Sequence, residues 1–136
     1  MNKLIIERSK ENITIKDIET FENENNRVLP ENYKKLILKY NGGYVENSKF
    51  FRLLNSIKYG NNTVEFIIKI HQILEDNIPK EYLPIASDWS DNEITISLKK
   101  GNDYGKIYGF YFDVDRVEKI ADSLEELLGV KNIDEL

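Results

Sequence analysis

The segment spanning residues 30–43 constrains the fold most strongly, because its sequence sets both ends of one helix. Pro30 suits a helix start, where its missing N–H group would have no helical acceptor. Apolar side chains follow at helical spacing along one face: Tyr33, Leu36, Ile37 and Tyr40. Asn41, Gly42 and Gly43 then stop the helix, and Gly42 suits the left-handed position that often follows a helix end. The sequence therefore predicts a short amphipathic helix that ends at the glycine pair.

Two further elements flank this helix in the sequence. A helix is expected to begin at Thr14, which can form a capping box with Asp17, and to continue to about Glu24. After the glycine pair, residues 50–57 form a predicted strand, which the turn residues around Gly60 end.

Two periodicities compete in the stretch that begins at Val64. Alternating apolar residues favour a strand, whereas a set at helical spacing that includes His71 favours a helix to about residue 77. We predict the helix, with Asn62 as its N-cap and Glu65 as the capping-box partner.

The second half of the chain is predicted to form mostly sheet. Strands are expected over 93–98, 106–112 and 116–120, after a loop that leads to 83–87. A last helix, capped by Asp122 or Ser123, ends at Gly129. A helix pair, then antiparallel strands, then a closing helix indicate an α+β fold with a mostly antiparallel sheet flanked by helices. Because no repeat or linker is present, we expect a single domain over residues 1–136, with a core of about 14–128.

Composition removes several kinds of chemistry. The 136 residues include no cysteine and one histidine, which excludes disulfides, a thiol nucleophile, thiolate metal sites and a histidine-rich zinc site. The net charge of −5 argues against nonspecific nucleic-acid binding and against an anionic membrane surface as partner. No apolar run is long enough for a membrane span or a secretory leader, so we expect a cytoplasmic protein.

The acidic residues are concentrated in two blocks. Residues 75–93 hold one basic residue against six acidic ones, and residues 113–136 hold three against eight, so each block has a net charge of −5. Two interpretations remain open. The blocks form ordinary solvated faces, or they form an acidic surface that meets a basic partner.

No combination of residues indicates a specific catalytic site. His71 lies on the apolar side of its predicted helix, where a histidine usually packs against neighbours. Pairs of carboxylates in the acidic loops could in principle serve a glycosidase. The spacing of Asp88, Asp91 and Glu93, and of Asp113 and Asp115, is compatible with oxygen ligands of a divalent cation, but neither set has the pattern of an EF-hand loop. The aromatic strand near Tyr108 could stack on bases, although core packing explains it better. Trp89 is expected in a loop, either as a lid on the core or as an exposed anchor for a partner.

Four segments, in order, resemble the SUKH superfamily, which includes the Smi/Knr cell-wall assembly regulators and many bacterial immunity proteins. The segment 29–43 is similar to the family pattern LPxxYxxfLxxyNGG, and 83–98 to lPIAsDxxGNxIxl. Residues 105–113 are similar to the strand gkIyfwdHe, and 120–128 to the closing helix IAdSFeeFL. The chain departs from these patterns in two loops: Asp91 replaces the glycine before Asn92, and Val114 follows Asp113 where a histidine is common.

The resemblance implies a binding protein without enzymatic activity or cofactor. Relatives in the bacterial branch typically neutralise a cognate toxin, often a nuclease, so the resemblance implies a protein toxin as partner. Because nucleases bind phosphate groups, we expect this toxin to be basic. We expect no metal, direct nucleic-acid or membrane partner. Alternatives are a regulatory interaction module of the Smi/Knr type and a small-ligand or carbohydrate binder. The candidate partner-binding residues are Asp88, Trp89, Asp91, Glu93 and Asp113. Asp103 and Tyr104, in the neighbouring turn, are second-rank candidates.

Overall fold

In the described part of the chain, seven strands form one antiparallel sheet in which the order in space equals the order in sequence. The computed structural model describes residues 4–7 and 9–136. The strands are β1 (Ile5–Glu7), β2 (Gly43–Glu46), β3 (Leu53–Leu54), β4 (Tyr82–Ser87), β5 (Glu93–Ser97), β6 (Ile107–Tyr111) and β7 (Arg116–Ala121). Because every strand runs against its neighbours, successive turns alternate between the two ends of the sheet.

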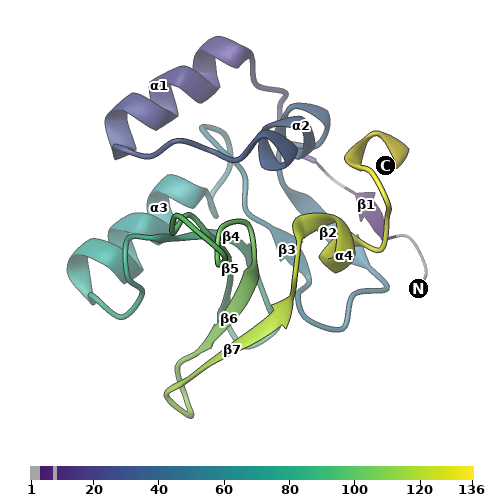
Figure 1. Ribbon diagram of the computed structural model, residues 1–136. Helices are drawn as coiled ribbons and strands as arrows, with labels where there is room; N and C mark the ends of the chain where they lie inside the picture. Colours follow the sequence, from purple (N-terminus) through teal and green to yellow (C-terminus); the bar gives the residue numbers. More distant parts are fainter. Residues whose placement is uncertain (1–3, 8) are drawn as a thin grey trace.

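The first three helices lie in the connections between strands, and the last follows β7. They are α1 (Ile15–Asn25), α2 (Glu31–Lys39), α3 (Val64–Ile68), which continues as a π-helix over Lys69–Leu74, and α4 (Leu124–Leu128), followed by a 3₁₀ turn over Ile133–Glu135. Figure 1 shows α1 and α2 together on one side of the molecule, with α3 beside the strands below them. The predicted α+β class, with a helix pair near the start and a closing helix, is confirmed.

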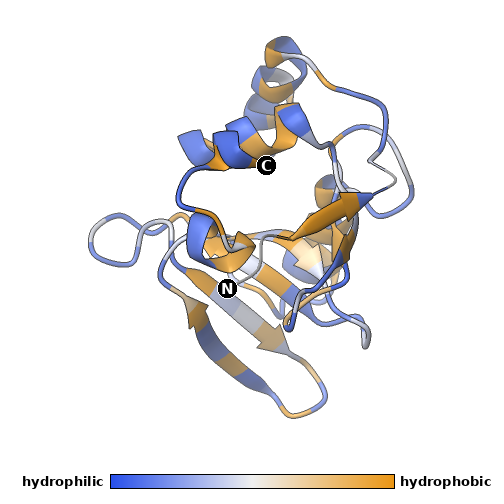
Figure 2. Ribbon diagram, turned by 90° about the vertical axis from the view of Figure 1, so that its right-hand side faces the viewer, coloured by the Kyte–Doolittle hydropathy of each residue, from blue (hydrophilic) through white to orange (hydrophobic). Residues whose placement is uncertain are grey.

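The core lies between the helices and the sheet. Side chains from α1, α2, α3 and α4 pack there against buried residues of β3, β4, β5 and β6. Figure 2 shows hydrophobic ribbon segments on the helices and strands where these two layers face each other, whereas the connecting loops are mostly hydrophilic. The central strand β5 is buried along its whole length, including its polar residues, because both of its faces are covered.

Cap chemistry predicted three helix ends correctly, but the N-cap predicted for α3 is wrong. Thr14 and Asp17 form the expected capping box at α1, and Ser123 caps α4, which ends at Gly129. At α3 the N-cap is Thr63, not Asn62, and Glu65 is not a box partner. The side-chain amide of Asn62 instead donates to Asn55 Oδ1 at 2.8 Å, and Glu65 accepts from the backbone N–H of Lys58 at 2.8 Å. Both predicted capping groups are therefore occupied by tertiary contacts.

The strand predicted over residues 50–57 is much shorter than expected. Strand β3 itself is limited to Leu53 and Leu54, although the backbone groups of Arg52 and Asn55 on either side also bond to β2 or β4. Before Arg52, the Ser48 hydroxyl holds the segment in a turn by accepting from the N–H groups of Phe50 and Phe51. Phe51 is nevertheless fully buried, so its apolar character reflects the core and not a strand.

The Asn-Gly-Gly segment joins three parts of the fold. The buried side chain of Asn41 donates to the carbonyl groups of Glu11 and Ile57, both at 2.8 Å, and accepts from the N–H of Ile57 at 2.7 Å. Gly42 has a φ of +78°, and a Cβ atom at this position would lie 2.8 Å from Ser56 Cβ. A Cβ on Gly43 would lie 2.6 Å from the carbonyl oxygen of Glu7. Helix α2 ends earlier, at Lys39, and its C-cap Tyr40 has an extended backbone, so Gly42 is not the left-handed residue directly after the helix end that we predicted. The two glycines instead allow β1, β2 and the β3 region to approach closely.

Candidate functional site

Two turns meet at one end of the sheet and carry most of the predicted contact residues. The β4–β5 turn spans residues 88–92, and the β6–β7 turn spans residues 112–115. Because β5 and β6 are antiparallel, with Glu93 opposite Phe110, both turns lie at the same end. The backbone N–H of Phe112 donates to Asn92 Oδ1 at 3.0 Å, which links the two turns directly. We call residues 88–92 and 112–115 the Trp89 end.

The β4–β5 turn is held in one conformation by Asp88. Its carboxylate accepts from the N–H groups of Ser90 at 2.8 Å and Asn92 at 2.9 Å, and from the Asn92 side-chain amide at 3.0 Å. Asp91 occupies the left-handed region with a φ of 61°, so the glycine common at this position in the resembling pattern is replaced without loss of the turn. Asp88 is thus a positioning residue whose carboxylate already has three donors.

Trp89 is the most prominent apolar side chain at this end, with 62% of its surface exposed. The sequence left two interpretations of Trp89 open. The prediction that it covers the core is wrong, and the prediction that it is exposed is confirmed. Val114 is also 62% exposed. The carboxylates of Asp91, Asp113 and Asp115 are exposed around these two residues on the same pair of turns. Residues from both acidic blocks of the sequence are thus brought together beside an exposed tryptophan.

Glu93 does not belong to this surface, although we predicted it as a contact residue. Only 2% of it is exposed, because it lies on β5 beneath the turn. Its carboxyl group accepts from the hydroxyl of Ser87, at 2.9 and 3.1 Å to its two oxygens, and from the side-chain amide of Asn55 at 3.2 Å. Burial raises the pKa of Glu93 to about 8, and the nearby carboxylates of Asp88 and Asp91 add to this effect. Alternation within the strand could not reveal this burial, because both faces of β5 are covered.

Asp103 and Tyr104 lie at the opposite end of the sheet, in the β5–β6 connection. Asp103 accepts hydrogen bonds from the hydroxyl groups of Tyr108 and, at 3.1 Å, of Ser97. The bond from Tyr108 lowers the pKa of Asp103. Tyr104 is 48% exposed. These two residues therefore cannot share one compact contact surface with Trp89, although the turns are neighbours in the sequence.

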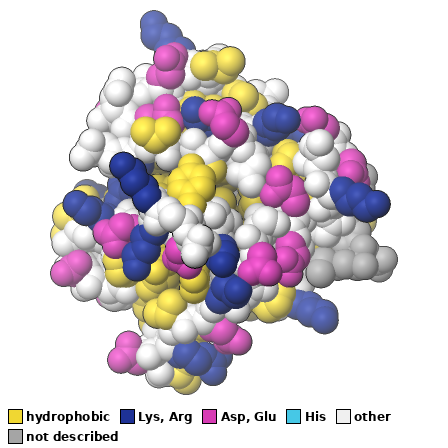
Figure 3. All heavy atoms as spheres, viewed as in Figure 1, with side chains coloured by type: hydrophobic (Ala, Val, Ile, Leu, Met, Phe, Trp, Pro, Cys, Tyr) yellow, Lys and Arg dark blue, Asp and Glu magenta, His cyan; other side chains and the backbone are white. Residues whose placement is uncertain are grey.

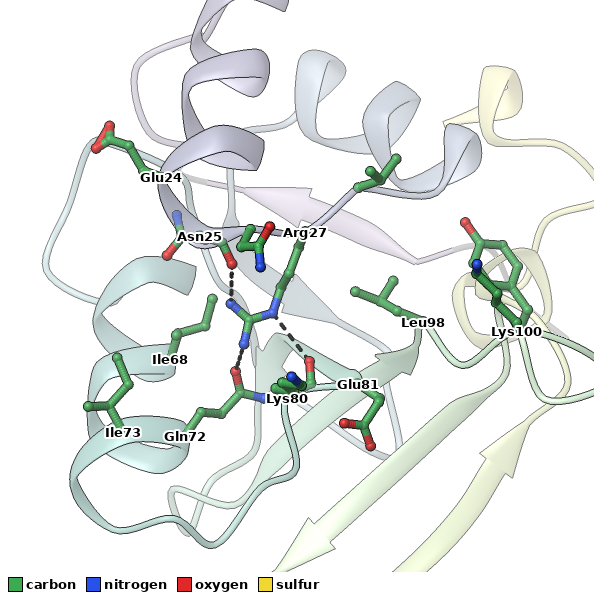
Figure 4. Close-up of a pocket in the computed structure, with 13 residues that line it drawn as sticks. Glu24, Asn25, Arg27, Ile68, Gln72, Ile73, Lys80, Glu81, Leu98 and Lys100 are labelled. Carbon is green, nitrogen blue, oxygen red and sulfur yellow. Dashed lines mark hydrogen bonds between the residues drawn. The ribbon is translucent and has the colours of Figure 1, made fainter.

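Tyr104 instead lines an open hollow of about 650 Å³ that the sequence did not indicate. The hollow lies between the α1–α2 connection, the π-helix and the β5–β6 connection (Figure 4). Arg27 projects into it, but its guanidinium donates to the carbonyl groups of Asn25 at 3.0 Å and Lys80 at 3.2 Å and to the side chain of Gln72 at 2.5 Å. Arg27 therefore holds the wall together. The face of the molecule in Figure 3 carries basic and acidic side chains interspersed, so it presents no field of one sign.

His71 has a structural environment, as the sequence suggested. Its ring stacks on Phe112 at a centroid distance of 4.6 Å, and its Nδ1 atom lies 2.9 Å from Asn77 Oδ1. Within residues 4–7 and 9–136, no group of three or more His, Asp or Glu side chains is arranged to hold a metal ion. None of the helices in the described part of the chain has the length and apolar character that a membrane crossing requires.

Comparison with known proteins gives one result of weight. No curated protein matches the chain. The SMI1 / KNR4 family (SUKH-1) matches residues 12–129, which include all four segments of the sequence resemblance and every candidate contact residue. This membership supports a role in protein interaction or immunity in general terms. With its α+β fold, its Asn-Gly-Gly junction and a match over most of its length, the chain belongs to the SMI1 / KNR4 family (SUKH-1).

Proposed function

We propose that this protein is a non-enzymatic immunity protein that binds and blocks a cognate protein toxin, and that the Trp89 end contacts the toxin. The observation that carries the proposal is the exposed Trp89 on a turn fixed by Asp88 and bordered by carboxylates. Tryptophan is enriched among the residues that dominate binding energy. A turn that is already ordered loses little conformational freedom on binding, which favours affinity.

The charge of the Trp89 end favours a basic partner. Within residues 4–7 and 9–136, the exposed carboxylates of Asp91, Asp113 and Asp115 form no ion pair. Toxins that cleave nucleic acid need basic residues to hold phosphate groups. An acidic surface would speed association with such a toxin and cover its substrate site. Binding at this surface should therefore weaken as the salt concentration rises.

Replacing Trp89 with alanine is expected to weaken toxin binding by at least about 1 kcal/mol, because the anchor is lost from the centre of the surface. Tyr104→Ala is the matched control, since Tyr104 is also a half-exposed aromatic residue but lies at the other end of the sheet. Affinity would be measured by titration calorimetry with the partner. If Tyr104→Ala weakens binding and Trp89→Ala does not, the hollow beside Tyr104 is the contact surface.

The partner itself can be found with the same three proteins. Tagged native protein, Trp89→Ala and Tyr104→Ala would be used in parallel to capture partners from the source cells and their close relatives, and bound proteins identified by mass spectrometry. A stoichiometric protein with a basic toxin domain, inhibited on titration and lost with Trp89→Ala, supports the proposal. A housekeeping enzyme or scaffold in that place indicates the regulatory alternative instead.

A further inference from the structure

Strand β7 leaves one long edge of the sheet open. It is the last strand in the order β1 to β7, and no other described strand lies on its far side. Residues 116–119 are exposed, including Val117 at 55%. Figure 1 shows the β6–β7 hairpin projecting from the body of the molecule. The exposed part of β7 is therefore residues 116–119, whereas its last residue, Ala121, is buried near α4. An uncovered edge presents backbone N–H and C=O groups that can pair with another strand.

Symmetry restricts how two copies of this strand can pair. Joining two sheets edge to edge with antiparallel strands requires a two-fold axis perpendicular to the sheet. Directly opposed residues then point to the same face, and because side chains alternate between faces, opposed residues must be separated by an even number of positions. One residue therefore lies on the axis opposite its own copy, and each possible register is defined by that residue.

The charges of β7 select one register. An axis at Arg116, Glu118 or Lys119 would place each of these charges opposite its own copy, which is destabilising. An axis at Ile120 would place Glu118 opposite Asp122, and an axis at Ala121 would leave most of β7 unpaired.

An axis at Val117 avoids every one of these conflicts. Valine faces valine, and each Arg116 faces the Glu118 of the second copy. The next pair outward opposes Lys119 to Asp115, which lies at the end of the hairpin turn, so it too joins opposite charges.

The two central charges are already arranged for this contact. Arg116 Nε lies 3.6 Å from Glu118 Oε2 on the same face of the strand, and the guanidinium lies 5.2 Å from the centre of the Tyr111 ring. Two such pairs across the axis would form a cluster of four alternating charges. The same charges disfavour pairing in other registers and pairing with uncharged strands. The edge should therefore bind its own copy selectively and not associate with strands in general.

We propose that β7 is a self-association edge, through which two copies of this chain pair antiparallel about Val117 and join their sheets. The contact is small, so the dimer is weak and forms at high protein concentration. This inference does not rest on the proposed function. In such a dimer, the Trp89 end of each copy would lie next to strand β7 of the other copy.

Sedimentation experiments on charge-reversed variants test the pairing. The native protein should show a monomer–dimer equilibrium by about 1 mM, a concentration at which even a weak contact is populated. Arg116→Glu and Glu118→Arg should each remain monomeric, because like charges then oppose each other twice across the axis. An equimolar mixture of the two variants should form heterodimers, since the first carries two carboxylates at these positions and the second two guanidinium groups. This rescue between copies cannot arise from the contact within one strand.

Controls separate specific pairing from general charge attraction. Lys131→Glu and Glu19→Arg change the net charge by the same amounts at exposed positions away from β7, and both should dimerise like the native protein. Circular dichroism would establish that all variants are folded. The proposal is overturned if the native protein stays monomeric, if either β7 variant dimerises alone, or if their mixture stays monomeric. Trp89→Ala should leave the dimer unchanged, so failure here and failure of toxin binding are distinguishable.

Discussion

Replacing Asn41 with alanine is expected to lower the free energy of unfolding by roughly 4 kcal/mol. Asn41 is fully buried, and its amide makes three hydrogen bonds to the backbone of Glu11 and Ile57. The substitution leaves the N–H of Ile57 and two carbonyl groups without these partners. Each buried polar group that loses its partner costs about 1–3 kcal/mol. Because the groups belong to different segments, no single segment can relax to satisfy all of them.

Urea unfolding followed by circular dichroism would measure this loss. Asn61→Ala is the matched control, because Asn61 is exposed and a surface substitution of this kind usually changes stability by less than about 0.5 kcal/mol. A loss for Asn41→Ala no larger than that of the control would show that the junction is not held by these three bonds. An unchanged denaturant slope would indicate that the native and denatured states keep their compactness.

Glu93 is expected to make the protein less stable at pH 8 than at pH 4.5. Burial raises its pKa in the folded protein to about 8, against an ordinary value of 4.5. Below pH 4.5 the carboxyl is protonated in both the folded and the unfolded chain, so it does not penalise folding. Between these two values only the unfolded chain ionises, and the free energy of unfolding falls by about 1.4 kcal/mol per pH unit. The total loss is on the order of 5 kcal/mol and is complete above pH 8.

Glu93→Gln should remove this pH dependence. The carbonyl oxygen of a glutamine can still accept from Ser87 and Asn55, which both donate to Glu93, and its amide nitrogen carries no charge at any pH. The variant should match the native protein near pH 4.5 and exceed its stability at pH 8 by about the full loss. Lowered pKa values at Asp17, Asp103 and Asp122 act in the opposite direction, because their stabilisation disappears as the pH falls. The difference between native protein and variant cancels those contributions.

Unfolding titrations at both pH values, with Glu19→Gln as an exposed control, would measure this difference. A stability difference between native protein and Glu93→Gln that does not change with pH would contradict the raised pKa. The result bears on the candidate site, because Glu93 lies directly beneath the turn that carries Trp89. A basic group bound near Asp88 and Asp91 would reduce the repulsion that those carboxylates exert on Glu93.

Elements with local causes could be predicted from short stretches of sequence. Thr14 with Asp17, Ser123 and Gly129 identified helix ends, because a cap depends on residues within one turn of each other. The strands over 93–97 and 107–111 followed from apolar patterning, and the family pattern around Asn41 indicated the fold. Only the tertiary structure decided the properties that depend on distant residues.

The depth of each candidate residue is such a property. Glu93 alternates with apolar residues and therefore looked exposed, but the second face of β5 is also covered. Antiparallel pairing placed Asp103 and Tyr104 at the opposite end from Trp89, because successive turns alternate between the ends of a sheet. Asn41 was predicted only as part of a helix stop. In the folded chain, its side chain holds together two segments that lie 30 and 16 residues away in the sequence. Local sequence encodes local geometry, whereas burial and proximity arise only when all strands have paired.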